Sequence, residues 1–179
     1  MDTNSPQAIF GAKFEEKLIN QFNHENVDFQ DVRNIKKYWA DDIDFIVSGK
    51  NGKKIMVEAK TTLFDKPQNK NISLGTSASG CSGWFWRTKC DVLVFGISQR
   101  NKIYIFNFKK FKDAVITAYK AKDMEFFSKF EEEYVTINPY DMKIDGIPGI
   151  ENTDFCMSIP WEIPEGISLY DIIVQMCGE

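Results

Sequence analysis

A mixed α/β domain, in which helices flank one central mixed β-sheet, is the fold class that the sequence predicts. Apolar residues recur with helical spacing at the start of the chain, after residue 108 and near the end. Short apolar stretches of strand length, bounded by turn residues, fill the middle. Since no internal repeat or clear linker interrupts the 179 residues, we expect a single domain over 1–179.

The first element is predicted to be an amphipathic helix over residues 6–23. Ser5 suits the N-cap and Pro6 suits the first helical position. Four apolar residues recur every four positions and form one stripe: Phe10, Phe14, Leu18 and Phe22. Glu15 lies at the border of this stripe, so its carboxylate is expected at the edge of a buried face. The alternative is a rim glutamate paired with a neighbour such as Lys17.

Two strands, over residues 43–47 and 54–60, are predicted to form a hairpin. The segment between them contains Asn51 and Gly52, a strong hairpin signal. A polar region over residues 63–83 follows and is expected to be a loop.

The register of this hairpin decides which side chains share a face. A two-residue turn would pair Asp44 with Ala59, whereas a three-residue loop over residues 50–52 pairs Asp44 with Glu58. We expect the three-residue loop, because its last position takes the left-handed conformation and Gly52 stands there.

Further elements follow from the same patterns. Strands are predicted at 91–97, 102–108, 134–137 and 155–159, and helices at 109–133, broken near Asp123, and at 169–176, capped by Ser168.

The formal net charge of −4 is unevenly distributed along the chain. Residues 1–122 carry 20 Lys and Arg against 13 Asp and Glu, a net charge of +7, and residues 123–179 carry 2 against 13, a net charge of −11. We therefore divide the chain into a core over roughly 6–122 and an acidic C-terminal extension over roughly 123–179. The basic part predicts a polyanionic partner. The acidic part is interpreted as facing away from this polyanion, where it contacts a protein partner or keeps the protein soluble. The alternative is that it covers the binding site for the polyanion.

Charged residues interrupt the apolar hairpin strands. In the expected register, Asp44, Glu58 and Lys60 share one face of the sheet. Two adjacent carboxylates repel each other unless a cation lies between them, and hard oxygen ligands suit Mg²⁺. A lysine beside such an ion can hold an attacking water, which is the chemistry of phosphodiester hydrolysis. The alternative is a surface ion pair between Glu58 and Lys60.

This pattern resembles the PD-(D/E)XK nuclease superfamily, including Holliday-junction resolvases and RecB-like nuclease domains. The matching residues, within roughly 6–108, are Gly11-x-x-x-Glu15, Asp44 and Glu58-Ala59-Lys60. The resemblance implies a restriction-endonuclease-like core. The sequence departs from the family pattern at Ile43, which stands where the family has its namesake proline. Asp42 is an alternative to Asp44 as the first carboxylate.

The resemblance also implies roles for these residues. Asp44, Glu58 and the carbonyl of Ala59 would bind the metal, Lys60 would position the water, and Glu15 would be an outer carboxylate of the catalytic site. Mg²⁺ is the implied cofactor, with Mn²⁺ as a substitute.

Aromatic and basic residues downstream predict a nucleic-acid contact. Five residues are the candidates: Lys66, Lys70, Trp86, Arg87 and Lys89. Aromatic rings stack on bases, and basic side chains contact phosphates.

Together these features predict a Mg²⁺-dependent DNA endonuclease acting on double-stranded or branched DNA, with a homodimer as one expected state. The alternatives are a catalytically inactive module of the same fold that binds nucleic acid or a protein, and a nuclease directed at RNA. The absence of a signal-peptide pattern, of a membrane-length apolar run and of paired cysteine motifs predicts a cytoplasmic protein with no membrane contact.

Overall fold

A computed structural model of the chain describes residues 5–61, 77–78, 81–82, 84–123, 125–126, 134–138, 141–145 and 154–178. Its centre is a six-stranded sheet in the order β1-β2-β3-β6-β7-β10. The strands are β1 (Phe29–Asp31), β2 (Phe45–Ser48), β3 (Lys54–Thr61), β6 (Val92–Ile97), β7 (Lys102–Asn107) and β10 (Cys156–Pro160). The β3–β6 pair is parallel and all other pairs in this sheet are antiparallel, so the predicted mixed sheet is confirmed.

Two separate hairpins accompany this sheet. They pair β4 (Ser77–Ala78) with β5 (Cys81–Ser82), and β8 (Tyr134–Asn138) with β9 (Asp141–Asp145).

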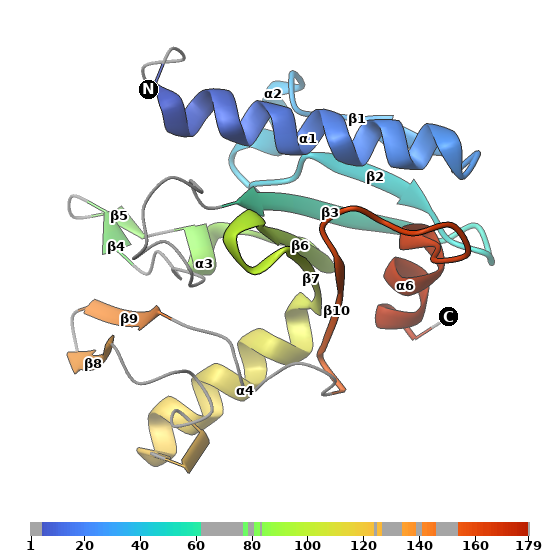
Figure 1. The fold of residues 1–179 in the computed structure, drawn as a ribbon. Coiled ribbons are helices and arrows are strands. Elements are labelled where there is room, and N and C mark those ends of the chain that lie inside the picture. The colour runs from blue at the N-terminus through green and yellow to red at the C-terminus, as the bar shows by residue number, and fades with distance from the viewer. Residues whose placement is uncertain are drawn as a thin grey trace.

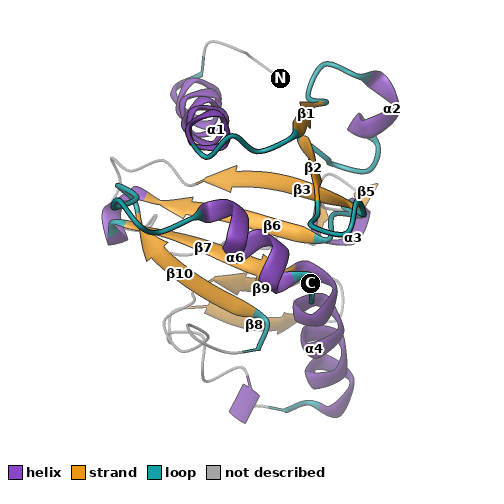
Figure 2. Cartoon of the chain, turned by 90° about the vertical axis from the view of Figure 1, so that its right-hand side faces the viewer, coloured by secondary structure: helices purple, strands orange, loops and turns teal. Residues whose placement is uncertain are grey.

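Helices cover both faces of the sheet, as predicted (Figures 1 and 2). They are α1 (Pro6–His24), α2 (Lys36–Trp39), α3 (Trp84–Arg87), α4 (Phe108–Ala121) and α6 (Leu169–Met176), with a 3₁₀ turn, η1 (Ser98–Arg100). Apolar side chains of α1 and α6 share one buried cluster, whereas those of α3 and α4 share another. Strand side chains alternate between the two clusters, so each face of the sheet has its own core. None of the helices in the described ranges is long and apolar enough to cross a membrane.

Helix α1 matches its prediction closely. The Ser5 hydroxyl accepts a hydrogen bond from the Ala8 N–H (3.2 Å), and the apolar stripe is buried from Phe14 onward. Gly11, which could permit another backbone to approach this helix closely, has no such neighbour among the described residues. A Cβ placed there would meet nothing within 4 Å among the described residues.

The hairpin has the predicted register. Phe45 pairs with Val57, and Gly49 donates its N–H to the Lys53 carbonyl (2.7 Å), which leaves a three-residue loop. Gly52 ends this loop with φ +78°, the left-handed conformation that glycine adopts without strain. One step beyond the Phe45–Val57 pair, the same register sets Asp44 opposite Glu58.

The C-terminal part of the chain completes the core. Strand β10 pairs with β7, and α6 buries Leu169 and Ile173 against the face that α1 covers. The carboxylate of Glu25, at the end of α1, holds the start of α6. It accepts hydrogen bonds from the Ser168 hydroxyl and from the N–H groups of Leu169 and Tyr170, each at 2.9 Å.

Replacing Glu25 by alanine is expected to lower the free energy of unfolding by about 2 kcal/mol. The change leaves two backbone N–H groups of α6 without their acceptor and removes a negative charge from a helix N-terminus. Urea unfolding followed by circular dichroism measures the effect. Glu165→Ala, which removes an exposed carboxylate nearby, is the control and should change stability by less than about 0.5 kcal/mol.

The sequence did not predict all local structure. The short helices α2 and α3 were not expected, and α4 ends at Ala121, followed by Lys122 in a left-handed conformation (φ 54°). The rest of the predicted helix, residues 127–133, lies outside the described residues.

Candidate active site

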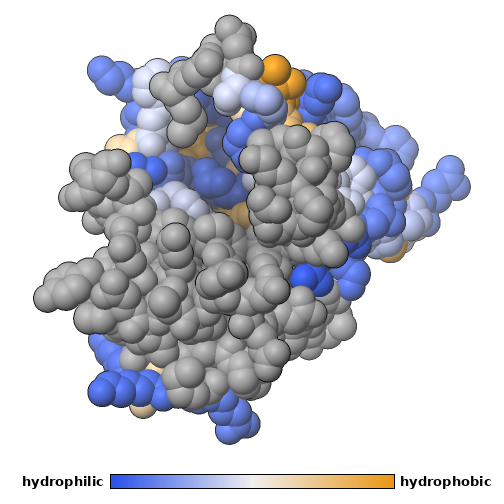
Figure 3. All heavy atoms as spheres, turned by 60° about the vertical axis from the view of Figure 1, so that its left-hand side comes forward, coloured by the Kyte–Doolittle hydropathy of each residue, from blue (hydrophilic) through white to orange (hydrophobic). Residues whose placement is uncertain are grey.

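Asp44 and Glu58 lie side by side at one end of the sheet, where β2 begins and β3 ends. This end faces left in Figure 1, beside the start of α1 and α3. Gln7 of α1 donates to the Thr61 carbonyl (3.2 Å), which ties the start of α1 to the end of β3. Viewed from this side, the surface has a hollow with strongly hydrophilic residues inside it (Figure 3).

Glu58 is a buried carboxylate in an apolar strand. It is 1% exposed, and neither of its oxygens has a hydrogen-bond partner of good geometry within the described ranges. Among the described residues, its ion-pair partner is the Lys60 ammonium, which contacts Oε1. Burial raises the pKa of Glu58 well above its ordinary value, and the attraction of Lys60 only partly opposes this. A buried, under-bonded carboxylate is costly, so its retention here is consistent with a ligand role.

Asp44 completes the carboxylate pair. Its Oδ2 accepts a hydrogen bond from the Ala59 N–H (2.9 Å), and burial raises the pKa of its carboxyl. The Asp44 N–H donates to the Val57 carbonyl (3.0 Å), so Val57 turns its backbone groups toward β2. Ala59, two residues on, turns its N–H and carbonyl to the same side. The Ala59 carbonyl therefore faces the side of β3 on which Asp44 lies.

Lys60 contacts the carboxylate of Glu58 and lies over an aromatic ring. Its ammonium lies 5.9 Å from the ring centre of Trp84, a cation–π contact. Burial lowers the pKa of Lys60, but the carboxylates of Glu58, Asp44 and Asp42 outweigh this effect and raise it overall. Lys60 is therefore a hydrogen-bond donor in this structure.

Glu15, on α1, lies at the edge of this group. Its Oε2 forms an ion pair with Arg33 (2.8 Å), and its side chain is 27% exposed. Burial raises the pKa of Glu15, and Asp44 and Lys60 are near enough to influence it. Glu15 therefore contributes to the electrostatic field of the site from a position at its rim.

Asp42, the alternative first carboxylate, has a different environment. It stands in a left-handed conformation (φ 47°), and its carboxylate forms an ion pair with Arg87 (3.1 Å). Asp44, by contrast, contacts Ala59 directly beside Glu58. The geometry therefore favours Asp44 as the partner of Glu58.

The predicted nucleic-acid-binding residues are only partly described. Trp86 is 41% exposed, and Lys112 donates to its carbonyl (3.1 Å). Arg87 and Lys89 are exposed but paired, the second with Asp41 (2.8 Å). Lys66 and Lys70 lie outside the described residues. A nucleic-acid role for these five residues stays a prediction.

The site fits a hard divalent cation held by few protein ligands. Asp44 and Glu58 supply carboxylate oxygens, and the buried oxygens of Glu58 have no hydrogen-bond partner of good geometry among the residues that the structure describes. Across the described residues, no group of three His, Cys, Asp or Glu side chains is close enough to hold a metal. Two carboxylates, with a carbonyl nearby, suit Mg²⁺, which usually keeps several waters.

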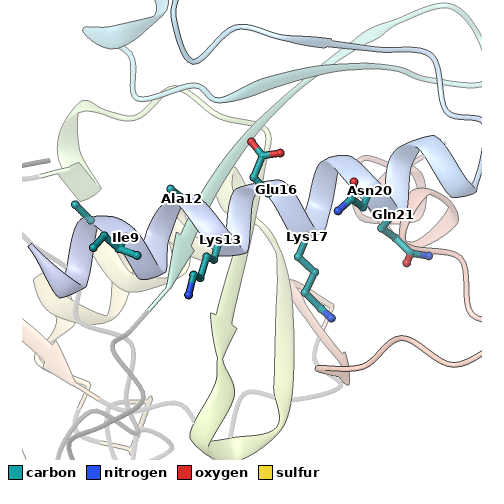
Figure 4. A pocket seen from close by; sticks show the side chains of 8 residues that line it. Ile9, Ala12, Lys13, Glu16, Lys17, Asn20 and Gln21 are labelled. Atoms are coloured by element: carbon teal, nitrogen blue, oxygen red, sulfur yellow. The ribbon is translucent and has the colours of Figure 1, made fainter. Parts of the chain in front are cut away.

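A pocket elsewhere on the surface does not coincide with these residues. It runs along the outer side of α1 and is lined by side chains such as Ile9, Lys13 and Lys17 (Figure 4). None of the sequence-predicted site residues lines it.

Sequence reasoning missed two residues of the site. Arg33, in the loop after β1, binds Glu15, and Trp84 of α3 lies against Lys60. Trp84 belongs to the aromatic-basic segment that the sequence singled out, but its contact with Lys60 depends on the fold. No local pattern marked Arg33.

The chain was compared with protein families, curated proteins and solved structures. No protein-family model matches the chain, and no curated protein matches it. Among solved structures, a bacterial homing endonuclease is similar over 57% of this chain and 70% of its own, with 11% sequence identity and a TM-score of 0.39.

Proposed function

We propose that this chain is a Mg²⁺-dependent nuclease that hydrolyses phosphodiester bonds in DNA. The observation that carries the proposal is the buried carboxylate of Glu58, opposite Asp44 in the hairpin and in contact with Lys60. An acidic pair with an adjacent amine is the arrangement that metal-assisted hydrolysis needs. The sequence resemblance to PD-(D/E)XK nucleases, carried by these residues, supports the same conclusion.

Each residue of the group has a proposed role. Asp44, Glu58 and the Ala59 carbonyl hold the cation, and Glu15, paired with Arg33, is an outer carboxylate at the rim of the site. The bound cation would lower the pKa of a water and neutralise charge on the phosphate. Lys60 orients the attacking water through a donated hydrogen bond, and its charge stabilises the phosphate as it gains negative charge. Trp86, Arg87 and Lys89 are proposed to contact the nucleic acid near this group.

The proposal is tested by incubating supercoiled plasmid and branched DNA with the full chain in Mg²⁺ or in EDTA. We expect cleavage in Mg²⁺ and none in EDTA. Mn²⁺ should substitute for Mg²⁺. Lys60→Met should lower the cleavage rate by about a hundredfold or more, because it removes a donor aimed at the reacting group. Lys54→Met removes the same charge at the exposed start of the same strand, so it is the matched control and should cleave at the wild-type rate.

Matched RNA and DNA duplexes in competition decide the substrate class. Preferential cleavage of the RNA would replace DNA by RNA in the proposal. Tight binding of any nucleic acid without metal-dependent cleavage would contradict the enzyme and favour a binding module.

A further inference from the structure

Arg33 gathers three carboxylates around one guanidinium. Its Nη1 contacts Glu15 (2.8 Å), its Nη2 contacts Asp31 (2.7 Å) and Glu16 (3.1 Å), and its Nε also donates to Asp31 (3.0 Å). The guanidinium lies 5.5 Å from the ring centre of Phe45, at the start of β2. Arg33 thus joins α1, β1 and β2 through one side chain that is only 18% exposed.

The loop that carries Arg33 is itself fixed. The Arg33 N–H donates to Asp31 Oδ1 (3.1 Å), and its carbonyl accepts from Trp39 Nε1 (2.7 Å). On α1, Glu16 projects to the side opposite Lys13 and Lys17 (Figure 4), where it meets Arg33. A donor with five N–H groups in a planar fork suits such a multiple contact.

The consequence of this geometry concerns Glu15. Its carboxylate is near enough to Asp44 and Lys60 to interact with both electrostatically. Its Oε2 is nevertheless bonded to Arg33, and no third acid joins Asp44 and Glu58 in a metal-binding group among the residues described. The ion pair with Arg33 offsets part of the Glu15 charge and fixes the direction of its carboxylate.

We propose that Arg33 is a positioning residue that holds Glu15 out of the cation site and limits that site to two carboxylates. This inference depends on the proposed function, because it concerns the same site. A site with two carboxylates binds the cation more weakly than one with three and leaves more of its coordination to water and phosphate. Loss of Arg33 releases Glu15, and the cation then gains a third anionic ligand.

Calorimetric titration of the full chain with Mn²⁺, in the absence of nucleic acid, tests this. Arg33→Met should bind Mn²⁺ at least about fivefold more tightly than wild type, because one more carboxylate reaches the ion. Glu15→Gln alone should change the dissociation constant by less than about twofold, because Arg33 already holds that carboxylate away from the ion.

Two double variants separate release of Glu15 from a general change in charge. Arg33→Met with Glu15→Gln and Arg33→Met with Glu16→Gln have the same net charge. The first should return to wild-type affinity, whereas the second should keep the tighter binding, because Glu16 is 60% exposed and is not among the charges that act on Asp44 or Glu58. Equal affinity of the two doubles would show a charge effect alone and overturn the inference.

The remaining outcomes are also decisive. If Arg33→Met does not fold, as judged by circular dichroism, Arg33→Gln replaces it, because glutamine also lacks the positive charge that pairs with Glu15 but keeps a hydrogen-bonding end. An unchanged affinity for Mn²⁺ in the variant that folds refutes the role of Arg33. A loss of Mn²⁺ affinity in Glu15→Gln as large as that in Glu58→Gln refutes it too. Mn²⁺ uptake that depends on Glu58 but not on Arg33 defeats this inference alone, whereas the absence of any Glu58-dependent uptake also defeats the proposed function.

Discussion

Glu58→Gln is expected to remove metal-dependent cleavage while making the metal-free protein more stable. The cleavage rate should fall by roughly a thousandfold, because the amide loses the anionic charge that holds the cation and helps to activate its water. Calorimetry should show loss of Mn²⁺ uptake by the same variant.

The gain in stability follows from the environment of the Glu58 carboxylate. It is 1% exposed and has no hydrogen-bond partner of good geometry in the described part of the chain, so the charged form is disfavoured there. Burial raises its pKa well above the ordinary 4.5 despite the nearby ammonium of Lys60. Glutamine resembles the protonated form, which the folded state prefers. In EDTA at pH 8, we expect the variant to gain about 1 kcal/mol or more in free energy of unfolding.

The sign of the pH dependence follows from the same shift. A carboxyl whose pKa is higher in the folded state than in the unfolded state contributes its stabilisation in full below the unfolded value. That contribution is lost as the pH rises through the folded value. Wild-type stability in EDTA should therefore fall as the pH rises from about 4.5, and Glu58→Gln should show a smaller fall. The pKa values of Asp44 and Glu15 are also raised, so part of the pH dependence of stability remains in the variant.

Thermal unfolding in EDTA between pH 4.5 and 8 measures both effects. Glu165→Gln, at an exposed position, is the control and should follow the wild-type curve. A Glu58→Gln variant that cleaves DNA at the wild-type rate would remove Glu58 from the proposed site. A variant less stable than wild type at pH 8 would show that the ion pair with Lys60 outweighs the cost of burial.

The sequence predicted the hairpin because its signals are local. A glycine in the left-handed position of a three-residue loop sets the register, and the register alone sets Asp44 opposite Glu58. Helix α1 was predicted for a similar reason, since its cap and its apolar stripe lie within the segment itself.

Contacts between distant segments were beyond this kind of prediction. Arg33 is 18 residues from Glu15 in sequence, and only the packing of α1 beside β1 and β2 brings them together. The contact between Lys60 and Trp84 likewise depends on where α3 meets the sheet. The pairing of Arg87 with Asp42, across 45 residues, gives a residue predicted to contact phosphate an acidic partner.

Gly96 of β6 lies where α1 packs closely on the sheet, so a larger residue at this position is expected to lower the stability strongly. A glycine inside a strand marks a bulge or a close approach, and here it is a close approach. A Cβ at Gly96 would lie 2.5 Å from the Phe14 ring and 2.7 Å from the Trp161 ring. These two rings stack at 5.3 Å between centroids, and Phe14 is 1% exposed, so the rings have little room to move.

Gly96→Ala is therefore expected to lower the free energy of unfolding by about 3 kcal/mol, as measured by urea unfolding. Gly11→Ala is the matched control of opposite sign, because it adds a Cβ in α1 where nothing lies within 4 Å among the described residues. It should stabilise the protein by roughly 0.5–1 kcal/mol through helix propensity. Combining Gly96→Ala with Phe14→Leu should cost less than the sum of the two single changes, because the smaller side chain relieves the clash. Additive costs would instead show that the added methyl group does not meet Phe14, and the close packing of α1 on β6 would have to be revised.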